Sequence, residues 1–217
     1  MPLPVIKINH RKLLFHITVF HLIGIAGLSI NITRPWFEPV TPFVLLVNMA
    51  LLLAFHSPWS AKHILLFIFI AFAGYFVEVA GVLTANIFGE YHYGDILGIR
   101  IFETPLIIGI NWLMLIYFVY FTGKKTGLAS WLQVAAGAGL MVIYDLILEP
   151  VAIRMDMWRW PEGAVPFQNY IAWFTISAVF LSLLHGFRLE IRNKLALGLF
   201  FIQAGFILSL NIIYRFI

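Results

Sequence analysis

The sequence predicts an all-α, polytopic membrane protein, a single integral-membrane domain over residues 1–217 with about seven membrane-spanning helices. Of the 217 residues, 62% are hydrophobic and only 11% are charged, and the mean hydropathy is +0.94. A typical soluble domain carries about 25% charged residues. Apolar runs close to the roughly 20 residues that a spanning helix needs recur along the chain, separated by stretches that contain Pro, Gly and charge.

Seven apolar runs are expected to form the membrane spans. The first follows a basic N-terminal stretch but lacks a small-residue cleavage site, so we expect a retained helix and not a removed signal peptide. The longest breaks separate the third run from the fourth and the fifth from the sixth. The expected spans are residues 13–30, 41–56, 63–84, 104–121, 129–149, 167–187 and 195–214.

Lysine and arginine are distributed unevenly between the two sides of the predicted bundle. Nine lie on the side of the N-terminus, namely Lys7, Arg11, Lys12, Lys62, Lys124, Lys125, Arg188, Arg192 and Lys194. Five lie on the other side, namely Arg34, Arg100, Arg154, Arg159 and Arg215. Because cytoplasmic loops carry the excess of Lys and Arg, we expect a multi-pass protein of the inner (cytoplasmic) membrane with a cytoplasmic N-terminus. The same bias explains the net charge of +4, so no nucleic-acid partner is expected.

Three carboxylic acids lie within predicted spans, all toward the outer side. Glu78 has apolar neighbours on both sides, whereas Asp145 and Glu149 are four residues apart and therefore share one helix face. Ionisable groups inside a membrane are costly and usually functional. We therefore expect these acids to form a polar pocket in the outer half of the membrane, with one of them neutral and able to donate a proton.

Each of these acids also has a structural interpretation. Glu78 alternatively forms a hydrogen bond to a neighbouring helix and stabilises the bundle. Asp145 and Glu149 form a coupled pair, one neutral and one ionised. Alternatively, Glu149 is solvated just before Pro150 and pairs with Arg154.

Two polar-aromatic segments follow the spans that hold the acids. Residues 90–95, which include His92 and Tyr93, are expected to form a lid or a water-handling patch, or else part of the aromatic belt at the membrane surface. Trp158 and Trp160 have a similar pair of interpretations, because Trp often anchors helices at the headgroup level. Their position beside the acids favours the rim of a substrate site.

Amide and aromatic side chains also interrupt the later spans. Asn169 and Trp173 share a helix face, and Trp112 follows Asn111 in the fourth apolar run. Asn in a membrane most often bridges helices. The aromatic content of 17% is high, and aromatic faces are able to hold a polyene and to stabilise a carbocation.

Several motifs that would indicate other functions are absent. The seven His show no HxxH, HxxHH or HExxH spacing, so no metal site is expected. The GxGxxG and GxSxG patterns are missing, and there is no Cys. The last span has no mid-membrane Lys, which excludes a retinal Schiff base.

As a set, these residues resemble the carotenoid biosynthesis proteins of bacteria and archaea, whose characterised members include CruF-type carotenoid 1,2-hydratases. The resemblance covers about residues 70–175, and its motifs follow the order of the family. They are Glu78 with Gly81 and Thr84, Phe88-Gly89-Glu90-Tyr91-His92-Tyr93, Pro105 with Asn111-Trp112, Asp145 with Glu149-Pro150, Trp158-Arg159-Trp160, and Val165-Pro166 with Asn169 and Trp173. Glu149 stands where many members carry Asp, which keeps the charge.

The resemblance implies a cofactor-independent hydro-lyase that adds water to the terminal C1–C2 double bond of a lycopene- or gamma-carotene-like isoprenoid. Either Glu78 or Asp145 would protonate C2, and a remaining carboxylate, Glu149 among them, would take the proton of the attacking water. Asn169 and His92 would hold that water. The cation and the polyene would lie against aromatic side chains, namely Trp112, Trp158, Trp160, Trp173 and Tyr93. No metal or redox cofactor is required.

Two alternatives stay open. A carotenoid end-group cyclase or isomerase protonates the same polyene but then loses a proton, and the small membrane cyclases carry a Pro-x-Glu-Glu motif that is absent here. A non-enzymatic bundle that binds or transports lipid or carotenoid would need an aqueous path to both faces. The expected partners are the carotenoid, membrane lipid, and either a second copy of the chain or other carotenoid enzymes.

Overall fold

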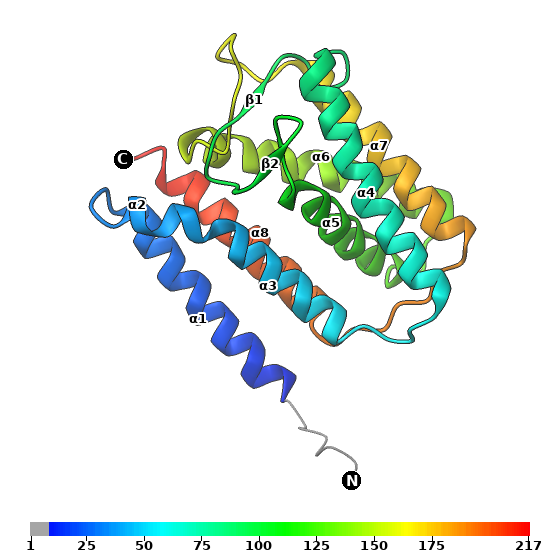
Figure 1. Ribbon diagram of the computed structural model, residues 1–217. Helices are drawn as coiled ribbons and strands as arrows, with labels where there is room; N and C mark the ends of the chain where they lie inside the picture. The colour runs from blue at the N-terminus through cyan, green and yellow to red at the C-terminus, as the bar shows by residue number, and fades with distance from the viewer. Residues whose placement is uncertain (1–8) are drawn as a thin grey trace.

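A computed structural model describes residues 9–217 as a bundle of long helices whose axes are roughly aligned (Figure 1). Within these residues, seven helices are long and apolar enough to cross a membrane, which confirms the predicted fold class. The helices are α1 (His10–Ser29), α2 (Arg34–Phe37), α3 (Thr41–Ala54), α4 (Ala61–Thr84), α5 (Ile107–Lys124), α6 (Ser130–Arg154), α7 (Phe167–Gly186) and α8 (Ala196–Ile213). A short 3-10 helix, η1 (Glu38–Val40), joins α2 to α3, and these three form the second span.

Most predicted boundaries differ from the observed ones by a few residues, and two differ for identifiable reasons. The fifth span does not end at residue 149, because α6 continues through Pro150 to Arg154. Pro150 lies on the exposed face of the helix. The fourth span begins at Ile107 and not at residue 104, because the chain before it forms a β-hairpin. Lys7, one of the basic residues used to predict the orientation in the membrane, lies outside the described residues. The orientation of the bundle in the membrane stays a prediction.

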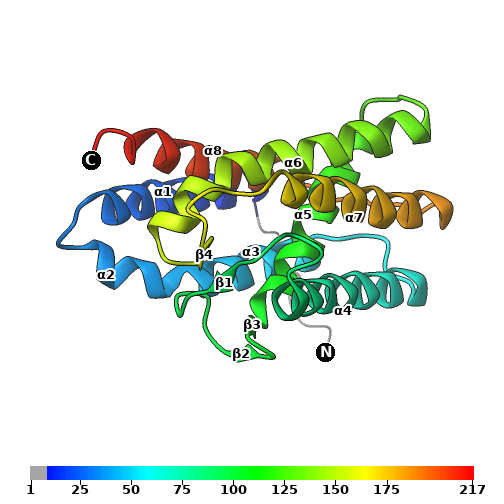
Figure 2. The ribbon, with the colours of Figure 1, turned by 90° about the horizontal axis from the view of Figure 1, so that it is seen from above.

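Helix α5 is the central helix of the bundle. In its most apolar stretch of 18 residues, 72% of the residues are buried, whereas the corresponding share in the other spans is 17% to 44%. It packs against α3 and α4 on one side and against α6, α7 and α8 on the other (Figure 2). Gly109 allows a close approach of α5 to α4, since a Cβ atom at this position would fall onto the backbone oxygen of Ala71. One turn later on α5, Trp112 packs on Gly74 of α4 and its indole nitrogen reaches Glu78.

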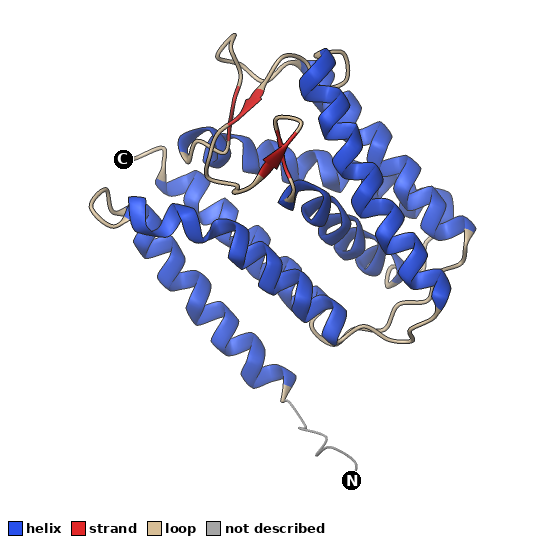
Figure 3. Cartoon of the chain, in the orientation of Figure 1, coloured by secondary structure: helices blue, strands red, loops and turns tan. Residues whose placement is uncertain are grey.

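Two short antiparallel ribbons lie together at one end of the bundle (Figure 3). Strand β1 (His92–Tyr93) pairs with β4 (Trp158–Arg159), and β2 (Arg100–Ile101) pairs with β3 (Thr104–Pro105). In the first ribbon Tyr93 lies opposite Trp158, and His92 lies opposite Arg159. Successive residues of a strand point to opposite faces. Tyr93 and Trp158 are accordingly buried, while His92 and Arg159 are exposed.

The close packing of α4 on α5 leads to a prediction about stability. Gly109→Ala should lower the thermal unfolding midpoint of the purified protein, because overpacking of this kind typically costs about 1–3 kcal/mol. Gly205→Ala is the matched control, because Gly205 is exposed on α8 and a Cβ there would meet nothing within 4 Å. The control should be neutral or slightly stabilising, since Ala is the better helix former. Equal midpoints for the two variants would contradict the close approach.

Candidate functional site

The predicted acids meet in one small buried cavity, which we call the carboxylate chamber. Its volume is about 30 Å³, which is room for one or two water molecules and not for a branched hydrocarbon end. Helices α4, α5, α6 and α7 and the two long loops all contribute to its wall. The lining residues are Glu78, Phe88, Tyr91, Tyr93, Ile108, Asn111, Trp112, Asp145, Leu148, Glu149, Trp158, Trp160, Asn169 and Trp173.

The chamber brings together all but one of the site residues that the sequence predicted. The exception is His92, which points away on the outer face of β1, with a side chain that is 66% exposed and 3.7 Å from Glu90. His92 is therefore not placed to hold a water molecule in the chamber. Tyr91 was missed as a site residue. Its spacing from Tyr93 could have identified it, because residues two apart on a strand point to the same face.

Glu78 accepts three hydrogen bonds from neutral donors. The indole nitrogen of Trp112 donates to Oε1 at 2.8 Å, and the hydroxyls of Tyr91 and Tyr93 donate to Oε2 at 2.6 and 2.7 Å. Three donors suit an ionised carboxylate, which has only acceptor sites. Burial, and then the nearby charge of Glu78, raise the pKa of both Tyr hydroxyls above the usual value. Both hydroxyls therefore stay protonated and keep donating.

Asp145 and Glu149 lie one turn apart on α6, with different partners. The amide of Asn169 on α7 donates to Asp145 Oδ2 at 2.7 Å, whereas Asp145 Oδ1 is buried and has no hydrogen-bond partner among residues 9–217. Glu149 Oε2 accepts hydrogen bonds from the indoles of Trp158 and Trp160, both at 3.0 Å. These contacts show that the carboxyl group of Glu149 is not solvated at the helix end.

The alternative pairing of Glu149 with Arg154 is also wrong. The guanidinium of Arg154 lies over the ring of Tyr214, 5.3 Å from its centroid. Because α6 continues past Pro150, Arg154 lies beyond the chamber and Glu149 stays buried inside it.

Aromatic rings form the apolar part of the chamber wall. Trp112 of α5 stacks on Trp173 of α7, with ring centroids 4.6 Å apart and planes at 28°. The ring centroids of Tyr91 and Trp160 are 5.2 Å apart. The faces of these rings carry negative electrostatic potential, which favours a cation in the chamber.

The β1–β4 ribbon with its flanking residues, 91–95 and 156–160, closes the chamber, and we call it the cover. Its two segments are joined by a hydrogen bond from the Gly94 nitrogen to the Met157 oxygen at 2.9 Å. Only Gly fits at position 94, because a Cβ there would fall onto the backbone oxygen of Asp156.

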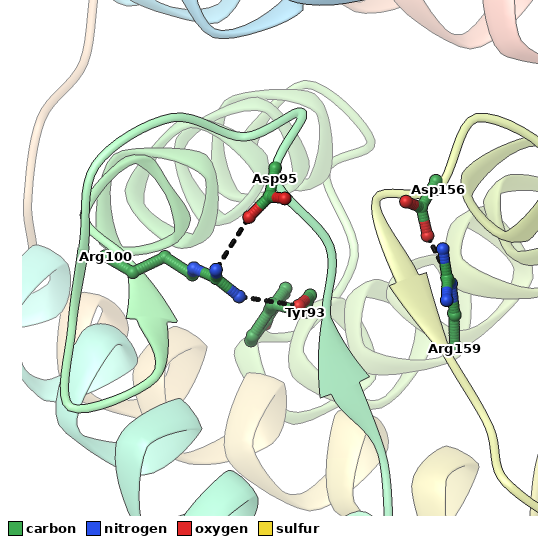
Figure 4. A network of polar contacts seen from close by, with 5 residues as sticks. All are labelled: Tyr93, Asp95, Arg100, Asp156 and Arg159. Atoms are coloured by element: carbon green, nitrogen blue, oxygen red, sulfur yellow. Dashed lines mark hydrogen bonds and ion pairs between the residues drawn. The ribbon is translucent and has the colours of Figure 1, made fainter.

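Charged side chains form ion pairs on the outer side of the cover (Figure 4). Arg100 donates to the backbone oxygen of Tyr93 at 2.9 Å and to Asp95 at 2.6 Å. Arg159 pairs with Asp156 on the other segment. The inner side of the cover is held by hydrogen bonds from Trp and Tyr to the acids, so the buried acids and the cover depend on each other.

The chain also matches a family of known proteins. The family model described as "Carotenoid biosynthesis protein" matches residues 40–212, well over half of the chain. The chain belongs to the carotenoid biosynthesis protein family. The predicted resemblance is thereby confirmed, and every residue that lines the carboxylate chamber falls within the matched range.

A curated relative of this carotenoid biosynthesis protein is the bisanhydrobacterioruberin hydratase of Haloarcula japonica. It is 27% identical over 118 residues, which make up 48% of this chain and 39% of the relative. The match thus spans well under two thirds of the relative's length. No solved structure matches the chain. Within residues 9–217, no group of three or more His, Asp or Glu side chains is placed to hold a metal ion.

The bonds between cover and acids generate a second prediction. Trp158→Phe combined with Trp160→Phe removes both donors to Glu149, and an unpaired buried polar group typically costs about 1–3 kcal/mol. The cover should then open more often, so trypsin should cut after Arg159 faster than in the wild type. Trp131→Phe is the matched control, because Trp131 is 70% exposed and far along α6 from the chamber. Wild-type cleavage rates in the double variant would show that the indoles do not hold the cover.

Proposed function

We propose that this carotenoid biosynthesis protein is a carotenoid 1,2-hydratase, which adds water to the terminal C1–C2 double bond of an acyclic carotenoid end. The observation that carries the proposal is the buried, unpartnered Oδ1 of Asp145 in a water-sized chamber that also contains two hydrogen-bonded carboxylates. Family membership supports a carotenoid substrate, and the similarity to a bisanhydrobacterioruberin hydratase supports hydration.

Asp145 is the proposed acid. Three carboxylates crowded into one water-poor chamber are not all ionised, because like charges at short range repel strongly. Glu78 and Glu149 each accept hydrogen bonds from two or more donors, which favours their charged forms. Asp145 accepts a single hydrogen bond and has a free oxygen. A protonated Asp145 carries an O–H group at that oxygen and directs it into the chamber.

The proposed reaction begins when the chamber, which has room only for water in this structure, widens to admit the end group and Asp145 transfers its proton to C2. The C1–C2 π electrons form the new C2–H bond, which leaves a tertiary carbocation at C1. The stacked rings of Trp112 and Trp173 and the fixed negative charge of Glu78 stabilise this cation. Asn169 holds Asp145 in position and does not itself transfer the proton.

A water molecule in the chamber completes the addition. Its oxygen bonds to C1, and its surplus proton passes to Glu149, whose Oε1 accepts no hydrogen bond from the described residues. Glu149 then returns a proton to Asp145, one turn away on the same helix face. The sum is one water added per end group, and both acids regain their starting states.

Removal of either key carboxylate should abolish hydration. Asp145→Asn lacks the acidic proton, and loss of a general acid typically costs about 10²–10⁴-fold in rate. Glu78→Gln removes the negative charge beside C1 and should also reduce the product strongly. Glu162→Gln is the matched control, because Glu162 is exposed and lies outside the chamber. The readout is the mass of the pigments made in a host that supplies an acyclic carotenoid.

The pigment masses distinguish the outcomes. Hydration adds the mass of one water per reacted end, whereas a cyclase or isomerase leaves the mass unchanged. Full hydration by Asp145→Asn would contradict the assignment of the acid. A cyclic or rearranged wild-type product of unchanged mass would contradict the hydratase proposal itself.

Deuterated water separates the acid from the base. Glu149→Gln keeps the acid but lacks the group that takes the proton from water. It should therefore exchange hydrogen at C2 for deuterium while forming little alcohol, because protonation without water capture reverses. Asp145→Asn should show neither exchange nor alcohol. Exchange in Asp145→Asn but not in Glu149→Gln would reverse the two assignments.

A further inference from the structure

A second and larger cavity adjoins the carboxylate chamber, and we call it the lateral groove. Its volume is about 320 Å³, about ten times that of the chamber. Four residues line both cavities: Ile108, Asn111, Leu148 and Trp158.

The groove opens on the flank of the bundle. Helix α1, which packs on α8, provides one wall, and the span formed by α2, η1 and α3 provides the opposite wall (Figure 2). At the mouth, Phe20 and Ile23 face Trp36 and Val40, and these side chains are 41% to 80% exposed. At the inner end Leu148 is only 8% exposed. The residues of this mouth belong to the first two candidate membrane spans, so in a bilayer the mouth would open toward lipid, while the inner end meets the chamber.

The side chains that line the groove favour an apolar, conjugated ligand. None of the described residues that line it is a Lys, Arg, Asp or Glu, so the groove has no charged side chain to bind a lipid headgroup. Aromatic rings occur along its length, from Trp36 at the mouth through Phe37 and Phe206 to Trp158 at the chamber. Flat aromatic faces pack well against an extended conjugated chain.

We propose that the lateral groove binds the long chain of a linear isoprenoid polyene, which enters sideways from the bilayer and presents its terminal double bond to the carboxylate chamber. The inference rests on the proposed function only for the identity of the reacting end. The chamber itself has room for water alone. The groove is the adjoining volume that has space for the chain, and the shared residues Ile108 and Leu148 mark where the end group passes.

The test uses two valine positions on α3. Val44 lines the groove, whereas Val47 lies three residues later, is 57% exposed and does not line it. Val44→Trp should fill the groove and reduce the polyene that co-purifies with the protein in nanodiscs about ten-fold, equivalent to about 1.4 kcal/mol of binding free energy. Val47→Trp should retain the wild-type amount. The probe is an acyclic C40 polyene, measured by its visible absorbance per mole of protein.

A second pair of variants covers the case in which Val44→Trp does not fold. Ile23 lines the mouth and is 55% exposed, so it tolerates a larger side chain, and its neighbour Leu22 is 58% exposed outside the groove. Ile23→Trp should reduce retention and Leu22→Trp should not.

Retention and hydration report separately on the two proposals. Polyene binding that is sensitive to Val44→Trp and Ile23→Trp, without any hydrated product, would support the groove and refute the hydratase. Equal retention by groove variants and their controls would overturn the groove, whatever the wild type produces. Retention by the wild type no higher than by protein-free nanodiscs would overturn it as well.

Discussion

The structure depends on the hydrogen bonds that satisfy three carboxyl groups inside an apolar bundle. Burial of such groups without partners would cost several kcal/mol each. Glu78 on α4 receives bonds from α5 and from the loop that follows α4, and Glu149 on α6 receives bonds from the loop that follows α6. Glu78 and Glu149 thus each tie a helix to the cover, whereas Asp145 ties α6 to α7. The groups that are most costly to bury are also the ones that determine how the loops fold.

The sequence predicts the spans and the positions of the acids well, because both depend on local composition. Hydropathy and length identify all seven spans, and the i, i+4 spacing places Asp145 and Glu149 on one face. The continuation of α6 past Pro150 was not predictable, because it depends on Pro150 facing outward. The role of Tyr91 was also missed, since it requires the pairing of β1 with β4 across a long separation in sequence.

The two cavities divide the properties that an addition of water to an apolar molecule requires. The carboxylate chamber has the volume of water and collects the polar atoms, whereas the lateral groove has the volume and lining for hydrocarbon. The groove left no sign in the sequence, because its residues are ordinary apolar side chains from many separate elements. Only the arrangement of α1 against α8 and of α3 against α5 creates it.

The pairing of β1 with β4 limits how the length of the cover can vary. Tyr91 and Tyr93 both reach Glu78, and Trp158 and Trp160 both reach Glu149, because each pair is separated by one outward-facing residue. A deletion or insertion of one amino acid between the members of a pair would turn one side chain toward solvent. Surface loops usually tolerate such length changes. In these two segments, by contrast, spacing is as much a part of the candidate site as the identity of the side chains.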